Sequence, residues 1–345
     1  VDGVGEITPG LIVLHAAAPA GVSLSALADM SAQRVLATGS GASINLAAVG
    51  SLTLQPATGA GALLTSGGAI SLAADTIIWT GTNSAVGAVT ALAKTGTLIV
   101  PGDTFSLTAD NLSFTAATDL SVDGTFHVSG NVGFKSTSGS MSMAADLYAR
   151  SGASIRTLEF EAGRNLSLLE GSFPNVTSKL SIIAGWELAQ SLTLLNWAAT
   201  GSAGELIVST GGNLVLGEPE LAQSTFKADY RISISSNGYT DDMGQQRGGN
   251  LAVVSVPTGW TTPRTRFLSL YAKYYLHLNE SFTASENLSM RGGQSMITRR
   301  AILRNLAGDI LADGPDAQSI LAKLAGSVAT ISGTRLELTQ GTILK

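Results

Sequence analysis

A short unit recurs along the chain: two apolar residues separated by one small or polar residue, with Gly, Asn, Asp or Ser shortly before them. Phe105-Ser-Leu107, Leu120-Ser-Val122 and Leu180-Ser-Ile182 are three of its copies. Successive side chains leave a β-strand on opposite faces, so the outer residues of each triplet share one face and the middle residue takes the other. The pattern therefore predicts many short strands that bury the apolar pair and expose the residue between.

The residues before the triplets predict tight corners, because Gly, Asn and Asp adopt positive φ at low steric cost. Between Phe105 and Val132 the triplets begin every 6 to 8 residues, which leaves room for a short strand and a short turn only. A hairpin sandwich would need strands of about 5–6 residues at a spacing of about 8–12. The corner residues include Asp103, Asp110-Asn111, Asp119, Gly130-Asn131, Gly163-Arg-Asn165, Gly211-Gly-Asn213 and Gly248-Gly-Asn250.

The expected fold is all-β: a right-handed parallel β-helix, or β-solenoid, with roughly three short strands per coil of about 20 residues. The right hand follows from the usual chirality of parallel crossovers. We expect a single continuous solenoid over 1–345. A β-sandwich or up-and-down barrel is the alternative, and the regular Gly-Gly-Asn unit and the lack of a Cys…Trp…Cys pattern disfavour it.

Composition excludes several classes of function. The chain has no cysteine, which removes disulfides, Cys-ligated zinc, iron–sulfur clusters and thiol nucleophiles. Its net charge is −5 and its Lys and Arg residues form no cluster, so nucleic acid is not an expected partner. No stretch of about 18 apolar residues is free of Gly, Ser, Thr or charge, so no transmembrane segment is expected.

Three segments interrupt the repeat. The segments 237–249 and 256–265 are polar and lack triplets, so they are expected to be loops inserted at corners of the solenoid. Within them, Tyr239, Asp241, Asp242, Arg247 and Trp260 have the chemistry for contact with a sugar or a protein. The third segment, 298–326, is expected to be irregular or helical, with a short helix near 315–325 because Ile320, Leu321 and Leu324 have helical spacing.

No catalytic or metal site is expected. His15, His127 and His277 match no metal-ligand spacing, and His127 and His277 take the outward middle position of their triplets. Asp119 with Asp123, or Asp241 with Asp242, could form an acid pair of the kind that cleaves glycosidic bonds, although all four residues also suit turns. We therefore expect no enzyme activity and no cofactor.

The repeated unit resembles the shaft repeats of filamentous-haemagglutinin-like exoproteins, the large adhesins exported by two-partner secretion. The resemblance rests on Gly163-Arg-Asn-Leu-Ser-Leu168, Gly211-Gly-Asn-Leu-Val-Leu216 and Gly248-Gly-Asn-Leu-Ala-Val253 and covers about 40–300 loosely. The Asn-Pro-Asn motifs of the family's secretion domain do not occur, so the resemblance implies shaft. It implies attachment or biofilm cohesion and no catalytic residue.

The sequence thus predicts a structural or adhesive shaft of a large secreted bacterial surface protein, located extracellularly at the cell surface. The expected partners are a glycan or protein on a host or sibling cell, or other copies of the chain end to end. A self-assembling filament or sheath subunit is one alternative, with exposed strand edges that pair between copies. A phage tailspike-like or polysaccharide-lyase-like β-helix that acts on glycans is the other.

Overall fold

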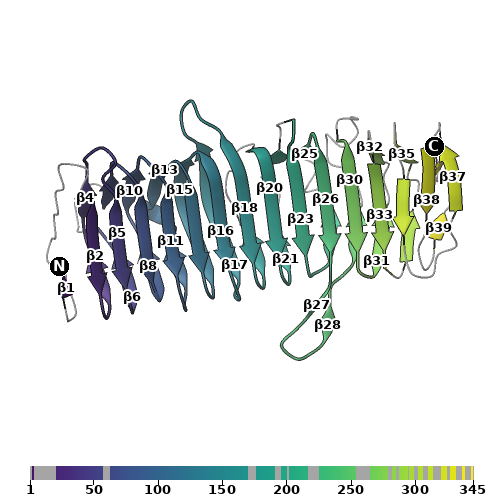
Figure 1. Cartoon of the computed structure of the whole chain (residues 1–345). Coiled ribbons are helices and arrows are strands. Elements are labelled where there is room, and N and C mark those ends of the chain that lie inside the picture. Colours follow the sequence, from purple (N-terminus) through teal and green to yellow (C-terminus); the bar gives the residue numbers. More distant parts are fainter. Residues whose placement is uncertain are drawn as a thin grey trace. The chain divides into compact units, whose positions relative to one another are not determined.

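The structure is a computed structural model. It describes residues 2–3, 21–56, 63–169, 176–190, 196–199, 202–216, 225–253, 265–278, 282–284, 287–293, 295–298, 302–305, 310–313, 320–324, 327–331, 336–338 and 343–344. The chain divides into two compact units, one formed by Val1–Gly163 with Ser167–Pro174 and the other by Arg164–Leu166 with Asn175–Lys345. Each unit is built almost wholly of parallel strands stacked coil upon coil, so the predicted β-solenoid fold is confirmed (Figure 1). A single solenoid running unbroken from 1 to 345 stays a prediction.

In the first unit the strands form three rows, and each coil adds one short strand to each row until two of the rows merge. Row one contains β1 (Asp2–Gly3), β2 (Val22–Ala26), β5 (Ile44–Ala48), β8 (Ile70–Ala74), β11 (Val89–Ala93), β14 (Leu112–Ala116), β16 (Gly130–Ser136) and β18 (Ile155–Ala162). Row two contains β3 (Met30–Ala32), β6 (Ser51–Leu54), β9 (Thr76–Trp79) and β12 (Leu98–Val100). Row three contains β4 (Val35–Ala37), β7 (Leu64–Ser66), β10 (Thr82–Ala85) and β13 (Ser106–Ala109), with the 3-10 turn η1 (Gly102–Thr104) just before β13.

Rows two and three merge in β15 (Leu120–Val128) and β17 (Met141–Ala149). Leu120 of β15 pairs with β12 and Phe126 pairs with β13, so one strand serves both rows. The strand turns at Gly124, where φ is +112° and a Cβ atom would lie 2.8 Å from the Phe105 carbonyl oxygen. Only glycine fits this bend, because a side chain would meet both the strained φ and the neighbouring coil.

The register of row one measures the length of each coil. Ile70 pairs with Val89, 19 positions further on, and Ile44 pairs with Ile70, 26 positions further on. Coil length in the first unit therefore varies from one coil to the next, whereas the sequence predicts about 20 residues per coil. The differences are taken up mainly in the corners, because the strands stay in register apart from one shift between Gly130 and Asn131.

Alternation along the strands decides what is buried. In β14, for example, Leu112, Phe114 and Ala116 are buried, while Ser113 is exposed. Apolar residues therefore stack on apolar residues in the interior. Six aromatic rings gather in the core of the first unit. The centroids of neighbouring rings lie 5.2–6.0 Å apart, distances at which aromatic pairs attract. The rings belong to Trp79, Phe105, Phe114, Phe126, Phe134 and Phe160.

The last inward position of the row-one strands carries a small residue, which lets the chain turn a narrow corner. It is Ala48, Ala74 or Ala93 in three coils and Ser136 in a later one, all essentially buried. The Ser136 hydroxyl donates a hydrogen bond to the Thr118 carbonyl oxygen of the preceding corner. A buried hydroxyl is thus tolerated because it has a partner.

Asn and Asp residues at several corners link one coil to the next. In the first unit Oδ1 of Asp29, Asn111 and Asp119 accepts the backbone N–H of Ser51, Asn131 and Ser140, at 2.7, 2.9 and 2.7 Å. In the second unit Oδ1 of Asn165, Asn213 and Asn250 accepts the N–H of Glu187, Asn250 and Tyr275, at 3.2, 3.2 and 3.3 Å. These side chains satisfy corner N–H groups, so we name this series the corner ladder.

Glycines at the corners serve two purposes. Gly130 and Gly248 have positive φ, as expected. Gly163 and Gly211 lie outside the positive-φ region but pack against the preceding corner, where a Cβ atom would lie 2.4 and 2.1 Å from a carbonyl oxygen. For these two, the interpretation from φ is wrong, and close approach of backbones is the reason for glycine.

The second unit repeats the design. Its main row contains β20 (Val176–Ala184), β23 (Glu205–Thr210), β26 (Arg231–Ser236), β30 (Phe267–Ala272), β33 (Asn287–Gly292) and β36 (Ile310–Asp313), with β22 (Asn196–Ala199) paired to β25 (Thr225–Ala228) alongside. A second row contains β24 (Leu214–Leu216), β29 (Leu251–Val253), β31 (Tyr275–Leu278), β34 (Ser295–Thr298) and β39 (Leu336–Leu338). A third contains β32 (Phe282–Ala284), β35 (Ile302–Asn305) and β40 (Ile343–Leu344). Two more short strands are β21 (Leu188–Gln190) and β19 (Leu166–Leu168), the last two residues of which belong to the first unit.

The predicted helix near 315–325 is wrong for the residues described there. Ile320–Leu324 forms strand β37, which pairs antiparallel with β38 (Ser327–Ile331), and β38 pairs in parallel with β36. The edge of β38 offers unpaired backbone groups, and pairing with them outweighs the weak helical spacing of Ile320, Leu321 and Leu324. Within 298–326, the other described stretches also belong to strands: Thr298 ends β34, and 302–305 and 310–313 form β35 and β36.

Candidate functional site

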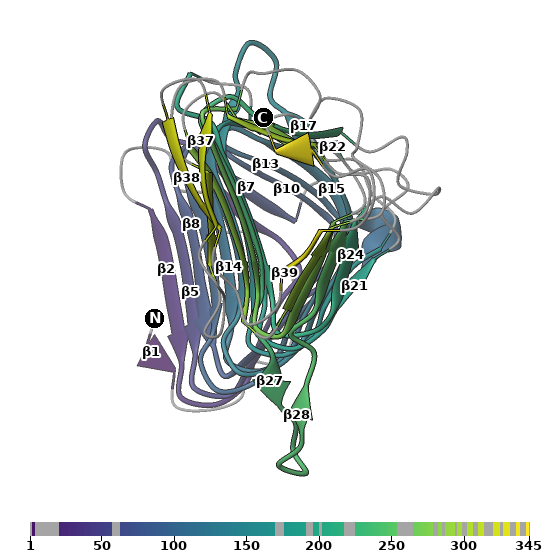
Figure 2. The same ribbon diagram turned by 90° about the vertical axis from the view of Figure 1, so that its right-hand side faces the viewer.

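The polar insertion 237–249 forms a hairpin that projects from the solenoid of the second unit (Figure 2). Its strands β27 (Tyr239–Thr240) and β28 (Gln246–Arg247) pair antiparallel. The chain returns to β29 through Gly248 and Gly249, both at positive φ. This coil is the long one, since Ile232 pairs with Leu268, 36 positions further on.

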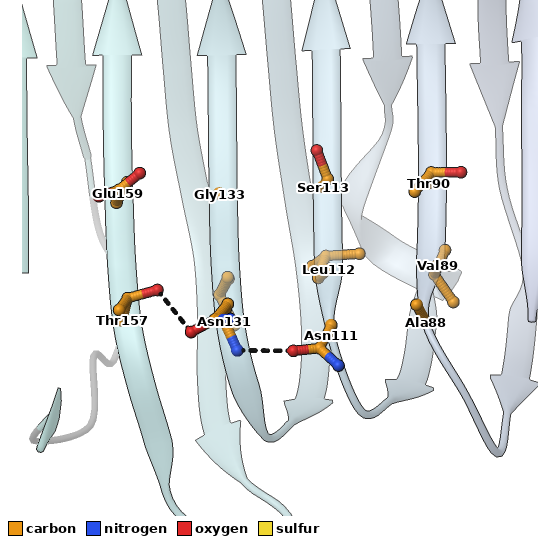
Figure 3. A pocket seen from close by; sticks show the side chains of 11 residues that line it. Ala88, Val89, Thr90, Asn111, Leu112, Ser113, Asn131, Gly133, Thr157 and Glu159 are labelled. Atoms are coloured by element: carbon orange, nitrogen blue, oxygen red, sulfur yellow. Dashed lines mark hydrogen bonds between the residues drawn. The ribbon is translucent and has the colours of Figure 1, made fainter. Parts of the chain in front are cut away.

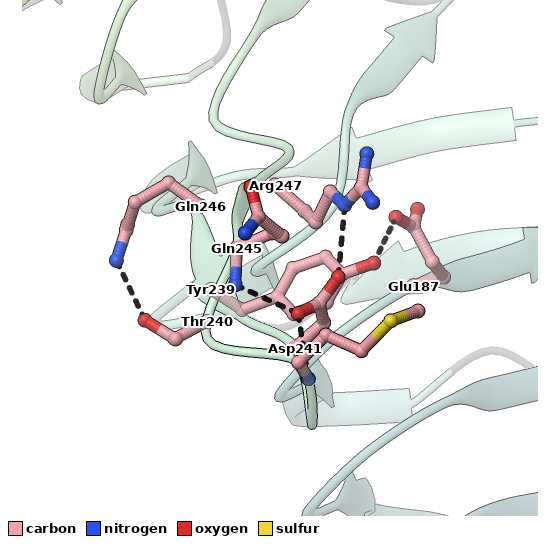
Figure 4. A network of polar contacts seen from close by, with 8 residues as sticks. Glu187, Tyr239, Thr240, Asp241, Gln245, Gln246 and Arg247 are labelled. Carbon is pink, nitrogen blue, oxygen red and sulfur yellow. Dashed lines mark hydrogen bonds and ion pairs between the residues drawn. The ribbon is translucent and has the colours of Figure 1, made fainter.

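Asp241 holds the tip of the hairpin (Figure 4). Its Oδ1 accepts the backbone N–H groups of Gln245 at 2.8 Å and Met243 at 3.0 Å, and its Oδ2 accepts Arg247 Nε at 3.0 Å. The hydrogen bond from Gln245 and then that from Arg247 lower the pKa of Asp241 below its ordinary value, because they favour the ionised carboxylate. The tip is therefore a structured turn.

Tyr239 fixes the base of the hairpin against the coils of its own unit. Its ring stacks on Trp186 with centroids 5.3 Å apart and planes 18° from parallel. Its hydroxyl donates to Glu187 Oε1 at 2.9 Å. Loss of water, and then the hydrogen bond to Glu187, raise the pKa of Tyr239 because both disfavour the phenolate.

Asp242 forms the second attachment. Its two carboxylate oxygens accept Arg164 Nη1 at 2.9 Å and Nη2 at 3.0 Å, a bidentate ion pair. The Arg164 guanidinium carbon lies 4.5 Å from the centroid of the Trp186 ring, a cation–π contact. We name Arg164, Trp186 and Glu187, with their partners Tyr239 and Asp242, the clamp.

The structure brings four of the five predicted contact residues together. All four lie on the hairpin. Asp241 and Arg247 bond to each other, whereas Tyr239 bonds to Glu187 and Asp242 bonds to Arg164. Their role in binding a partner stays a prediction. Trp260, with the segment 256–264, lies outside the residues that the structure describes.

Sequence reasoning missed Arg164, Trp186 and Glu187 as partners of the hairpin. Arg164 and Trp186 occupy corners of successive coils, where Trp186 N donates to Arg164 O at 2.9 Å. Each directly follows a glycine of the repeated corner unit, which is the one available signal. It shows that these side chains face outward, but it does not show which later segment reaches them.

Two surface grooves are also lined by described residues. The first, of about 460 Å³, lies on the outer face of β11, β14, β16 and β18 (Figure 3). Its floor has the small residues Thr90, Ser113 and Gly133, and the corner ladder at Asn111 and Asn131 borders it. The second groove, of about 330 Å³, lies on the outer face of β24, β29 and β31 in the second unit.

The remaining candidate groups lie outside the hairpin. His127 is exposed and stacks on Tyr148, with centroids 5.5 Å apart, and His277 is exposed on β31. Asp119 belongs to the corner ladder, and Asp123 Oδ1 accepts the N–H of Gly124 at 2.6 Å. His15 lies outside the described residues.

In the part of the chain that the structure describes, no three His, Cys, Asp or Glu side chains gather closely enough to hold a metal ion. The described residues also contain no helix with the length and apolarity to cross a membrane. No protein-family model, curated protein or solved structure matches this chain.

Proposed function

We propose that the chain is a structural and adhesive shaft of a large secreted bacterial surface protein. The observation that supports this most is the in-register stacking of parallel coils in each unit, with a continuous apolar interior and a corner ladder that links successive coils. Among the described residues, backbone pairing joins each strand to strands of the neighbouring coils, so such a stack can be lengthened by repetition and serves well as a stiff spacer.

The outer surface fits the same role. The outward positions of β2, β5, β8, β11 and β14 carry small or uncharged side chains, among them Ser23, Asn45, Ser71, Thr90 and Ser113. The hairpin projects from a coil, and the clamp holds it there. A rigid body that displays a fixed hairpin suits attachment to a glycan or protein on another cell.

The carboxylates weighed for a glycan-cleaving enzyme support the shaft instead. Asp119 and Asp123 bond to corner N–H groups, Asp241 organises the hairpin tip, and Asp242 pairs with Arg164. Each therefore has a local structural use that needs no substrate.

Electron microscopy of the native, full-length protein on and off the cell tests the proposal. Thin single rods attached at one end are expected. Long ordered polymers of this unit would favour the filament subunit instead, and stubby trimers would favour a glycan-processing spike. A polysaccharide-cleavage assay provides a second test: activity that disappears in Asp241→Asn with Asp242→Asn would overturn the assignment to a shaft.

A further inference from the structure

The groove on β24, β29 and β31 arises from the register of three neighbouring strands. Val215, Ala252 and His277 are paired in that order on the outer face, and the small Ala252 leaves a hollow between the two larger side chains. Asn213 and Tyr275 border the hollow at the start of the outer strands. The Tyr275 and His277 rings stand 6.4 Å apart at 69° to one another, so they form two walls of one concave surface.

The polar groups of the groove are few. Asn213 Oδ1 accepts two hydrogen bonds from Asn250, from the backbone N at 3.2 Å and from Nδ2 at 2.8 Å. The Asn213 amide nitrogen is left with its donors unused among the described residues. Tyr275 is 44% exposed, because it lies on the outward face of β31 beside the buried Leu276.

We infer that this groove binds a neutral sugar ring of a cell-surface glycan. One face of a pyranose ring presents only C–H groups and can cover the Tyr275 ring, while its rim hydroxyls can accept from the Asn213 amide and pair with the His277 imidazole. The residues that line the groove include no carboxylate, ammonium or guanidinium group, so a charged sugar would gain no ion pair there. This inference rests on the proposed adhesive function and names its ligand class.

The size of the groove favours a sugar over a protein partner. Three strands about 4.8 Å apart, each with three or four residues that rise about 3.3 Å, cover on the order of 150 Å². A stable protein interface buries about 800 Å² on each partner. A surface of this size instead suits one or two sugar rings, with a dissociation constant on the order of 1 mM, which repeated glycans on a cell surface would strengthen through avidity.

The groove of the first unit provides a contrast within the same chain. It also borders the corner ladder, but its lining has no aromatic ring and includes the carboxylate of Glu159. It therefore lacks the stacking platform that a sugar needs. Filling it, for example by Gly133→Arg, gives a matched control, because a Cβ atom at Gly133 meets nothing within 4 Å.

Saturation-transfer NMR on the full chain 1–345 tests the inference, with lactose, maltose, cellobiose and mannobiose as neutral probes and glucuronic acid as the charged one. At least one neutral disaccharide is expected to bind with a dissociation constant on the order of 1 mM. Tyr275→Ala should weaken it about tenfold, while Tyr275→Phe, which keeps the ring, should stay within about twofold. Ala252→Arg should abolish it and Gly133→Arg should not. Circular dichroism checks that each variant is folded.

Three outcomes would overturn the inference. The first is that no neutral probe binds when its concentration is about ten times the expected dissociation constant. The others are that glucuronic acid binds best, or that sugar binding survives in the folded Tyr275→Ala and Ala252→Arg variants. Microscopy of the same Tyr275→Ala variant separates the two proposals. Single rods without sugar binding would leave the shaft standing and remove only the sugar site.

Discussion

At the scale of single residues, the corner ladder gives a direct prediction about stability. Asn111→Ala removes the oxygen that accepts the Asn131 N–H at 2.9 Å, at an exposed corner where water replaces part of the bond. The free energy of unfolding should fall by about 0.5–1.5 kcal/mol, as for a typical hydrogen bond. Urea unfolding followed by circular dichroism measures it. Asn111→Asp keeps the acceptor and is the control, and an alanine variant as stable as the natural chain would show that the ladder is dispensable.

The sequence predicted which side chains face inward but not what the corner residues do. Period-two alternation alone places Phe126 and Val128 in the core and His127 outside, and the structure confirms all three. The corner ladder was missed because Asn and Asp were interpreted through their tolerance of positive φ. Their side-chain acceptors act on the next coil, some 20 or more positions away, and local patterns hold no information about that neighbour.

At the scale of elements, the hairpin is expected to loosen in acid. The pKa of Asp241 is lowered in the folded chain, so its contribution to stability is fully present above its unfolded value of about 3.8 and is lost as pH falls through the lower folded value. Hydrogen exchange should show constant protection factors for the Met243 and Gln245 amides from pH 7 to about 4.5. Protection should then decline below about pH 3.8, once intrinsic exchange rates are corrected.

Asp241→Asn separates charge from shape in this experiment. The amide oxygen still accepts the two backbone N–H groups, but the ion pair with Arg247 is gone. Protection in this variant should be lower at neutral pH and nearly independent of pH. A decline of the same size in acid in both proteins would assign the pH dependence to a group other than Asp241.

The hairpin also shows where prediction from sequence stops at this scale. A polar segment without triplets is easily recognised at 237–249. Its clamp joins Tyr239 to Glu187 and Asp242 to Arg164, pairs separated by 52 and 78 positions. These partners meet only because the intervening corners have particular lengths, and turn composition does not give those lengths.

At the scale of the whole molecule, the same limit applies to the fold. The triplets predict a solenoid, because strands this short and this closely spaced cannot form long hairpins. They do not predict which strand lies on which. Coil lengths measure 19 positions at Ile70 and 36 positions at Ile232, and β15 merges two rows into one strand. An expected coil length of about 20 residues therefore predicts the architecture. It does not predict which strands pair beyond the first few coils.

The last prediction follows from the similarity of successive coils, which should allow one coil to take the place of the next. Ile44 pairs with Val22 on one side and with Ile70 on the other, so deletion of 44–69 removes one full coil and brings β8 beside β2. The inward residues of β8, Ile-x-Leu-x-Ala, are those of the deleted β5, so Val22 and Ala26 would meet the same side chains as before. In a stack stabilised by nearest-neighbour contacts, the shortened chain should fold, with a β-sheet circular dichroism spectrum and a cooperative urea transition.

Deletion of 44–56 is the matched control, because it removes half a coil. It takes away β5 and β6 but leaves β7, so β2 and β8 can no longer meet in register without displacing β7 from β4. Its urea midpoint should fall well below that of the full-coil deletion, although it removes fewer residues. If instead the smaller deletion is the more stable one, the coils are not interchangeable units, and the mechanical argument for a shaft built by repetition loses its basis.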